Sequence, residues 1–166
     1  DQAKLQGFSR FDGPTILKAG CEFGPGHNFN APNGQVTRVG NNSTLTIEPT
    51  GGCFPAICWF QLDSDAWTNT SIDNLNPVTS DQVFDLQSVT YGGDLELVDV
   101  ASPGSYAAGQ VYRLFSAESY AGSFVNIVGL PALADPDLKW VNDLGTDGTL
   151  RVVYNAATVV PPAPES

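Results

Sequence analysis

Residues 82–98 have the sequence QVFDLQSVTYGGDLELV, and much of the chain follows the same pattern. Aliphatic or aromatic side chains alternate with polar ones on both sides of the Gly92-Gly93 pair. Alternation with a period of two predicts half-buried β-strands, and paired glycines favour a turn. We therefore expect strands at Gln82–Leu86 and Asp94–Val98, with a turn just before the second.

The alternating pattern recurs along the chain, while Gly, Pro, Asn and Asp interrupt every stretch that could carry a helical period. Gly40-Asn41-Asn42 favours a tight turn between two of the strands, and Asp147-Gly148 favours a turn before another. The pattern predicts an all-β protein with few or no helices. Further strands are expected at Gln35–Val39, Ser43–Ile47, Gln110–Phe115, Ser123–Ile127, Leu138–Val141 and Thr149–Val153.

The spacing of the later strands indicates the architecture. Every second strand begins after a similar interval, from Asp94 to Ser123, from Gln110 to Leu138 and from Ser123 to Thr149. A repeat of this length with two or more strands in each turn fits a short β-solenoid. A jelly-roll-like β-sandwich would show similarly spaced strands, so both architectures remain open at this point.

The chain fits a single β domain over residues 1–158, followed by a proline-rich tail over residues 159–166. Within the domain, residues 35–158 form the expected β-repeat core and residues 1–34 an N-terminal strand segment. That segment contains Leu5, Phe8 and Phe11 in one strand-like stretch. The strand either pairs back onto its own sheet or is exchanged between subunits as an assembly strand.

The charge balance excludes several classes of partner. The 166 residues include 18 Asp and Glu but only 7 Lys and Arg, which gives a net charge of -11. Nucleic acids and anionic membrane surfaces both require a basic face, so neither is expected as a partner. No apolar run is long enough for membrane insertion. The chain opens at Asp1 without a Met, as an exported protein would after cleavage, although an internal boundary would look the same. We expect an extracellular or cell-surface location.

Three cysteines and one histidine are the candidate reactive or metal-binding groups. Cys53 and Cys58 bracket four residues and are candidates for a disulfide, and Cys21 pairing with either one is the rival arrangement. The odd total leaves one thiol over. His27 stands alone in a Gly-Pro-Gly-His-Asn loop, away from any zinc-ligand spacing, so no zinc site is predicted.

One acidic and aromatic stretch holds the other candidate site residues. Asp63 and Asp65 are two positions apart, which on a strand would place both carboxylates on one face. Such a pair suits a solvated acidic turn, a Ca²⁺ site or, as a third reading, a catalytic acid/base pair. Trp59 and Trp67 beside them could form a platform for sugar rings, against the alternative of core packing. Apart from this possible Ca²⁺, no cofactor is predicted.

Three asparagines match the N-x-S/T acceptor pattern and are candidate glycosylation sites. They are Asn41, Asn42 and Asn69. In a chain rich in Asn and Thr such triplets also arise by chance.

Residues 92–153 carry a series of marks that fall in a fixed order. They are GQVYRLFSA at 109–117, YAGSFVNI at 120–127, LPAL at 130–133, LKW at 138–140 and LGTDGTLRVV at 144–153. This series resembles the terminal unit of autotransporter-associated β-strand repeat proteins, which are exported bacterial β-solenoid surface proteins. The chain departs from the family pattern in having Gln110 where the family usually has Asp, and an inserted-looking segment at residues 134–137.

The resemblance implies a scaffold, because none of the shared marks carries catalytic chemistry. The two glycines would provide turn conformations that a Cβ disfavours, and Asp147 would cap the turn through its own backbone. The apolar marks would face inward as core residues. The marks are Gly122 and Gly148 at turns, and Phe115, Phe124, Ile127, Leu130, Leu133, Trp140 and Leu150 in the core.

Together these features predict a non-catalytic, secreted structural or adhesive surface protein. It would self-assemble through β-edges or N-terminal strand pairing into an extracellular fibre or layer. The alternative is a carbohydrate-binding module of an exported protein, with a polysaccharide as its partner. A glycan-active enzyme is the third hypothesis, and we predict no catalytic residues.

Overall fold

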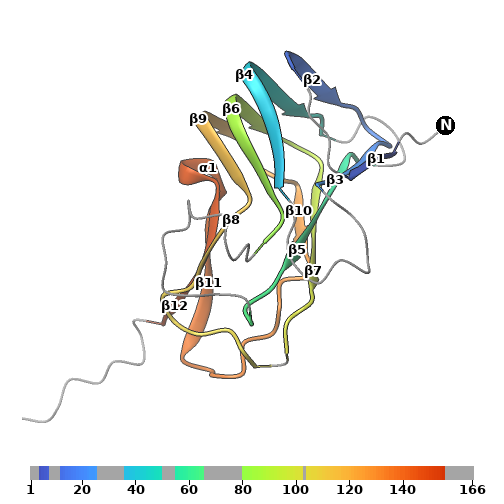
Figure 1. Ribbon diagram of the computed structural model, residues 1–166. Helices are drawn as coiled ribbons and strands as arrows, with labels where there is room; N and C mark the ends of the chain where they lie inside the picture. Colours follow the sequence, from blue (N-terminus) through green and yellow to red (C-terminus); the bar gives the residue numbers. More distant parts are fainter. Residues whose placement is uncertain are drawn as a thin grey trace, which may run out of the picture.

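The computed structural model describes residues 4–7, 12–25, 36–49, 55–65, 80–102 and 104–155 (Figure 1). In this part of the chain the regular structure is almost entirely β-strand, with one helix of four residues, α1 (Leu144–Asp147). The predicted all-β class is therefore confirmed. No described helix is long and apolar enough to cross a membrane.

Two parallel sheets form the body of the molecule. Sheet A has the strand order β1-β3-β5-β7-β10, and sheet B has the order β2-β4-β6-β9. All of their strand pairs are parallel. In sheet A the strands are β1 (Lys4–Gly7), β3 (Glu22–Pro25), β5 (Ile57–Leu62), β7 (Asp94–Asp99) and β10 (Asn126–Val128); in sheet B they are β2 (Pro14–Leu17), β4 (Val36–Ile47), β6 (Gln82–Tyr91) and β9 (Phe115–Gly122).

The chain alternates between the two sheets, so that each pass adds one strand to sheet A and one to sheet B. This winding is that of a β-solenoid. A jelly roll is built from antiparallel strands, so the parallel pairing decides between the two predicted architectures. In Figure 1 the strands of sheet B stand side by side along the solenoid axis, and β5 and β7 of sheet A lie behind and below them.

The predicted repeat is correct for one interval and wrong for the other two. Asp94 of β7 pairs with Asn126 of β10, close to the expected step from Asp94 to Ser123. The later strands do not form further coils. Instead β8 (Val111–Arg113), β11 (Leu138–Asp143) and β12 (Thr149–Tyr154) form an antiparallel sheet C in the order β11-β12-β8. Because the chain reverses direction between β11 and β12, this segment adds no further coil to the solenoid.

The predicted hairpin at Gly40-Asn41-Asn42 is also wrong. These residues lie inside β4, which runs unbroken from Val36 to Ile47. β4 pairs in parallel with β2 on one side and β6 on the other, so it cannot fold back on itself. The polar residues instead cause a register shift against β6 between Arg38 and Ser43, where Asn42 takes a left-handed backbone with φ of 67°. An irregularity of this kind bends a strand without ending it.

The core lies between the sheets and is made of side chains that stack from one coil to the next. In sheet A, Phe23, Cys58 and Leu95 are in-register neighbours, and each is almost fully buried. Aromatic rings fill the space toward sheet B, where the ring centroids of Phe60 and Phe115 are 5.0 Å apart. Stacking of like residues in neighbouring coils buries their apolar surface continuously.

The core residues expected from the C-terminal marks are found inside, with one exception. Phe115 and Leu150 are buried, and Phe124, Ile127, Leu133 and Trp140 are partly buried against the same cluster. Leu130 is 40% exposed, so its predicted core position is wrong. Leu130 follows β10, which is the last described strand of sheet A. No further described coil packs over it there.

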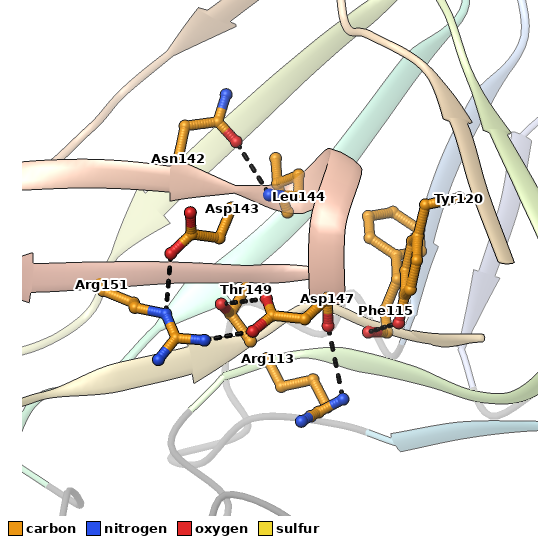
Figure 2. Close-up of polar contacts among 9 residues, drawn as sticks. All are labelled: Arg113, Phe115, Tyr120, Asn142, Asp143, Leu144, Asp147, Thr149 and Arg151. Carbon is orange, nitrogen blue, oxygen red and sulfur yellow. Dashed lines mark hydrogen bonds and ion pairs between the residues drawn. The ribbon is translucent and has the colours of Figure 1, made fainter. Parts of the chain in front are cut away.

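The C-terminal cap consists of sheet C and α1, which packs against β9. Figure 2 shows how polar side chains tie these elements together. Arg151 of β12 forms ion pairs with Asp143, at 2.8 Å between Nε and Oδ2, and with Asp147 of α1. Asp147 also accepts a 2.5 Å hydrogen bond from the Thr149 hydroxyl. The Asp147 carboxylate is therefore bonded to the side chains of the following strand, and not to its own backbone as predicted.

Gly148 ends α1 with a left-handed backbone, φ 76°, and a Cβ at this position would collide with the carbonyl oxygen of Phe115. Gly148→Ala should therefore destabilise the protein by more than about 1 kcal/mol, since both the conformation and the space exclude a side chain. Gly145→Ala is the matched control, because it lies in the same helix with nothing within 4 Å of its Cβ position. Urea unfolding of the two variants measures the difference. Equal stability of both variants would show that the close approach at Gly148 has no energetic role.

Candidate functional site: the outer face of sheet A

The outer face of sheet A carries two rows of side chains that run from coil to coil. The first row contains Glu22, Ile57, Asp94 and Asn126, which are in-register neighbours on β3, β5, β7 and β10. Each of these residues is partly or fully exposed, while the residues that alternate with them in β5 and β7 are buried. Parallel, in-register pairing thus turns an alternating sequence into a line of side chains across the sheet.

The second row contains Trp59 of β5, Glu96 of β7 and Val128 of β10. Trp59 and Glu96 are partly buried, and Val128 is 47% exposed. Because Asp94 and Glu96 are two residues apart on one strand, both carboxylates lie on the same face as the indole of Trp59. The outer face therefore places an aromatic ring directly beside carboxylates.

The electrostatics of this face are dominated by negative charge. The strands β3, β5, β7 and β10 contain no Lys or Arg, and Lys4 of β1 is in register with Glu22 at the far end of the first row. Partial burial raises the pKa of Glu96, and the neighbouring charges of Asp94 and Glu22 raise it further. Asp94 Oδ1 accepts a 2.8 Å hydrogen bond from the Asn126 side-chain amide. A face of this kind favours cationic or hydroxyl-rich ligands and repels anionic ones.

Asp63 and Asp65, predicted beside Trp59, lie beyond the end of its strand. Asp63 and Asp65 follow the end of β5, where the chain turns, so they do not share the face of a strand. Asp63 is buried and accepts a 3.0 Å hydrogen bond from the backbone N–H of Asp65, which is exposed. Trp67 lies outside the described residues. The platform of Trp59 and Trp67 therefore stays a prediction, and the described carboxylates beside Trp59 are those of Asp94 and Glu96.

The carboxylate of Asp65 is itself hydrogen-bonded to Ser102. Its Oδ2 accepts hydrogen bonds from both the backbone N–H (2.8 Å) and the hydroxyl (2.7 Å) of Ser102. These bonds, the hydroxyl first, lower the pKa of Asp65. In the part of the chain that the structure describes, no group of three or more His, Cys, Asp or Glu side chains could hold a metal ion. Asp63 and Asp65 therefore form a turn that ties β5 to the segment after β7, and a Ca²⁺ site there stays a prediction.

The Ser102→Ala substitution should raise the pKa of Asp65 part of the way toward its ordinary value, because one of the two bonds to its carboxylate is lost. A carboxylate with a lowered pKa stabilises the fold above its unfolded-state pKa, and this contribution is lost as the pH falls through the folded-state value. The variant should lose it at a higher pH than the wild type. NMR titration of the Asp65 carboxyl carbon measures the shift, with Ser119→Ala on β9 as the control. An unchanged titration curve in Ser102→Ala would contradict the assigned hydrogen bonds.

The cysteines differ from the predicted disulfides. Cys21 and Cys58 are free thiols in the structure. Cys58 points into the core between Phe23 and Leu95, where burial raises the pKa of its thiol well above the usual range. A protonated, buried thiol is unreactive and serves as a core residue. Cys53, the remaining partner in the predicted pairings, lies outside the described residues.

Two of the three glycosylation candidates fall on sheet B. Asn41 and Asn42 lie within β4, Asn42 is exposed, and Asn69 lies outside the described residues. Asn42 lines a hollow of about 490 Å³ at the bend of sheet B, together with Asp85, Gln87, Ser116 and Glu118. Asp85 of β6 has the same left-handed φ of 67° as Asn42 of β4, so the strands bend at corresponding places. Sequence reasoning missed this bend, because a non-glycine residue with positive φ has no clear local signal.

The other predicted site residues lie mostly outside the described part of the chain. Leu5 is in β1, which pairs in parallel with β3 of the same chain, with Leu5 opposite Phe23. Phe8, Phe11 and His27 fall outside the described residues. The acidic pair of the new face, Asp94 and Glu96, could have been found from the alternation in DLELV. The position of this pair beside Trp59 could not have been found, because the sequence of neither strand shows how the two strands pair.

Comparisons with protein-family models, with curated proteins and with solved structures found no match for this chain. The resemblance of residues 92–153 to a terminal unit of solenoid surface proteins therefore stays a prediction.

Proposed function

We propose that the protein is a non-catalytic structural or adhesive protein of the extracellular surface, which assembles end to end through the edges of sheet A. The observation that carries this proposal is the difference between the two sheets at the capped end. There, α1 packs against β9, the last strand of sheet B. Sheet A ends in β10, a strand of three residues that pairs with β7 on its inner side.

The residues around β10 support a contact with another molecule. Val125, Val128 and Leu130 are 55%, 47% and 40% exposed, so three aliphatic side chains within six positions face solvent beside a strand edge. An exposed edge offers unpaired backbone N–H and C=O groups to an incoming strand, and apolar side chains beside it add buried area when the strand pairs.

The incoming strand in this proposal is β1 of a second copy. β1 is the first strand of sheet A and β10 is the last among the described strands, so the two edges lie at opposite ends of one parallel sheet. A contact between two different surfaces of the same protein repeats without closing and gives a filament. The acidic composition supports an exported surface location and argues against nucleic acid as the partner.

A variant that places a charge on the edge tests the assembly. The double substitution Val125→Lys and Val128→Lys should convert concentration-dependent oligomers into monomers, because lysine opposes strand addition at a sheet edge. Light scattering coupled to size-exclusion chromatography measures the mass, and electron microscopy shows the form of the assembly. Tyr154→Lys is the matched control, since Tyr154 is 64% exposed on β12, away from the edge of sheet A.

A wild-type protein that stays monomeric at all concentrations and salt conditions would overturn the proposal. So would a double variant that assembles as the wild type does.

A further inference from the structure

We infer that the outer face of sheet A around Trp59 is a binding site for a cationic polysaccharide made of amino sugars. This site centres on β5 and β7, two inner strands of sheet A, and a single folded copy of the chain is enough to form it. Trp59, Asp94 and Glu96 form its centre.

Trp59, Asp94 and Glu96 are close enough together for one disaccharide unit to reach all three. Trp59 and Glu96 are direct cross-strand neighbours, and neighbouring strands are about 4.8 Å apart. Asp94 lies two residues before Glu96 on β7, which places it on the same face roughly 6.6 Å away along the strand. An aromatic ring and two carboxylates are thus held by the backbones of two central strands and not by loops.

The charge of the face determines which ligand it favours. Asp94 and Glu96 repel each other, and β5, β7 and their neighbours β3 and β10 contain no Lys or Arg. Lys4 lies on β1, three strands away from Asp94. A ligand that brings positive charge between the two carboxylates removes this repulsion and forms charge-assisted hydrogen bonds. Asp94 already accepts a hydrogen bond from Asn126 through Oδ1, which fixes the orientation of its carboxylate.

Trp59 distinguishes an amino sugar from a simple cation. The flat, apolar face of an indole packs against a sugar ring, and an ammonium group near the ring is attracted by its π-electrons. A metal ion would use only the oxygens, and the described residues contain no group of three acidic or other ligating side chains for it. Because both rows continue across several coils, the face suits an extended polymer better than a single sugar.

The direct test is isothermal titration calorimetry with three ligands. They are the hexamer of glucosamine, the hexamer of N-acetylglucosamine and hexalysine. The glucosamine hexamer should bind at least about tenfold more tightly than the acetylated one, because acetylation removes the charge that pairs with Asp94 and Glu96. It should also bind more tightly than hexalysine, which has the charge without the sugar ring. Equal binding of the two sugar hexamers, tighter binding of hexalysine, or no binding of the glucosamine hexamer would each overturn the inference.

Substitutions locate the site. Glu96→Gln keeps the size of the side chain and removes its charge, and it should weaken binding of the glucosamine hexamer about tenfold, equivalent to about 1.4 kcal/mol. Glu118→Gln on β9 of sheet B is the matched control, because it removes an exposed carboxylate from the other sheet and should leave affinity unchanged. Equal losses in the two variants would mean that net charge alone attracts the sugar.

Trp59→Phe tests the aromatic contribution without emptying the position. It should weaken binding of the glucosamine hexamer and leave binding of hexalysine nearly unchanged, and the thermal unfolding curve checks that the fold is intact. A folded Trp59→Phe variant with wild-type affinity for the sugar would remove the indole from the site. Titrations at a concentration at which light scattering shows only monomer keep the outcome independent of assembly.

Discussion

Parallel, in-register pairing between successive coils is the constraint on which the rest of this structure depends. Each inner strand of sheets A and B forms its backbone hydrogen bonds with the coil before it and the coil after it. The same register that satisfies these bonds stacks Phe23 on Cys58 and Leu95 inside, and Trp59 beside Glu96 outside. Core and candidate site therefore have a single cause. A shift of one residue in any strand would exchange the two faces of that strand.

A stack of coils must also end, and the last coil would expose both its backbone edge and its apolar interior. At sheet B the chain ends the stack by packing α1 against β9 and by changing to antiparallel pairing in sheet C, whereas sheet A ends in β10. Tyr106, Tyr112 and Trp140 pack together there, with ring centroids 5.4 to 5.8 Å apart. Arg151, with its ion pairs to Asp143 and Asp147, joins this sheet to α1 (Figure 2). The cap is thus a separate solution to a problem that the repeating part creates.

Much of the fold could be predicted from the sequence because strand alternation and turn glycines are local signals. Residues 82–98 alternate as the structure requires, and Gly148 occupies the turn expected of it. The errors arise where a distant neighbour decides. Gly40-Asn41-Asn42 would suit a hairpin in isolation, but β2 and β6 on either side hold it within one strand. Asp63 and Asp65 would share a face on a strand, but β5 ends at Leu62. The alternation in DLELV indicated that Asp94 and Glu96 share a face, whereas the position of Trp59 beside them follows only from pairing with β5.

The direction of the hydrogen bonds has a mechanical consequence. In both parallel sheets these bonds run along the solenoid axis, so tension along that axis would load only the two strand pairs, one in each sheet, that join neighbouring coils. Such a molecule unfolds one coil at a time. The first coil to separate is the one with the fewest side-chain contacts beyond its backbone hydrogen bonds. The cap end is reinforced by ring packing and by the ion pairs of Arg151, and β2 at the other end holds Ile16 at 56% exposure. Under tension, the coils would therefore peel from the N-terminal end toward the cap.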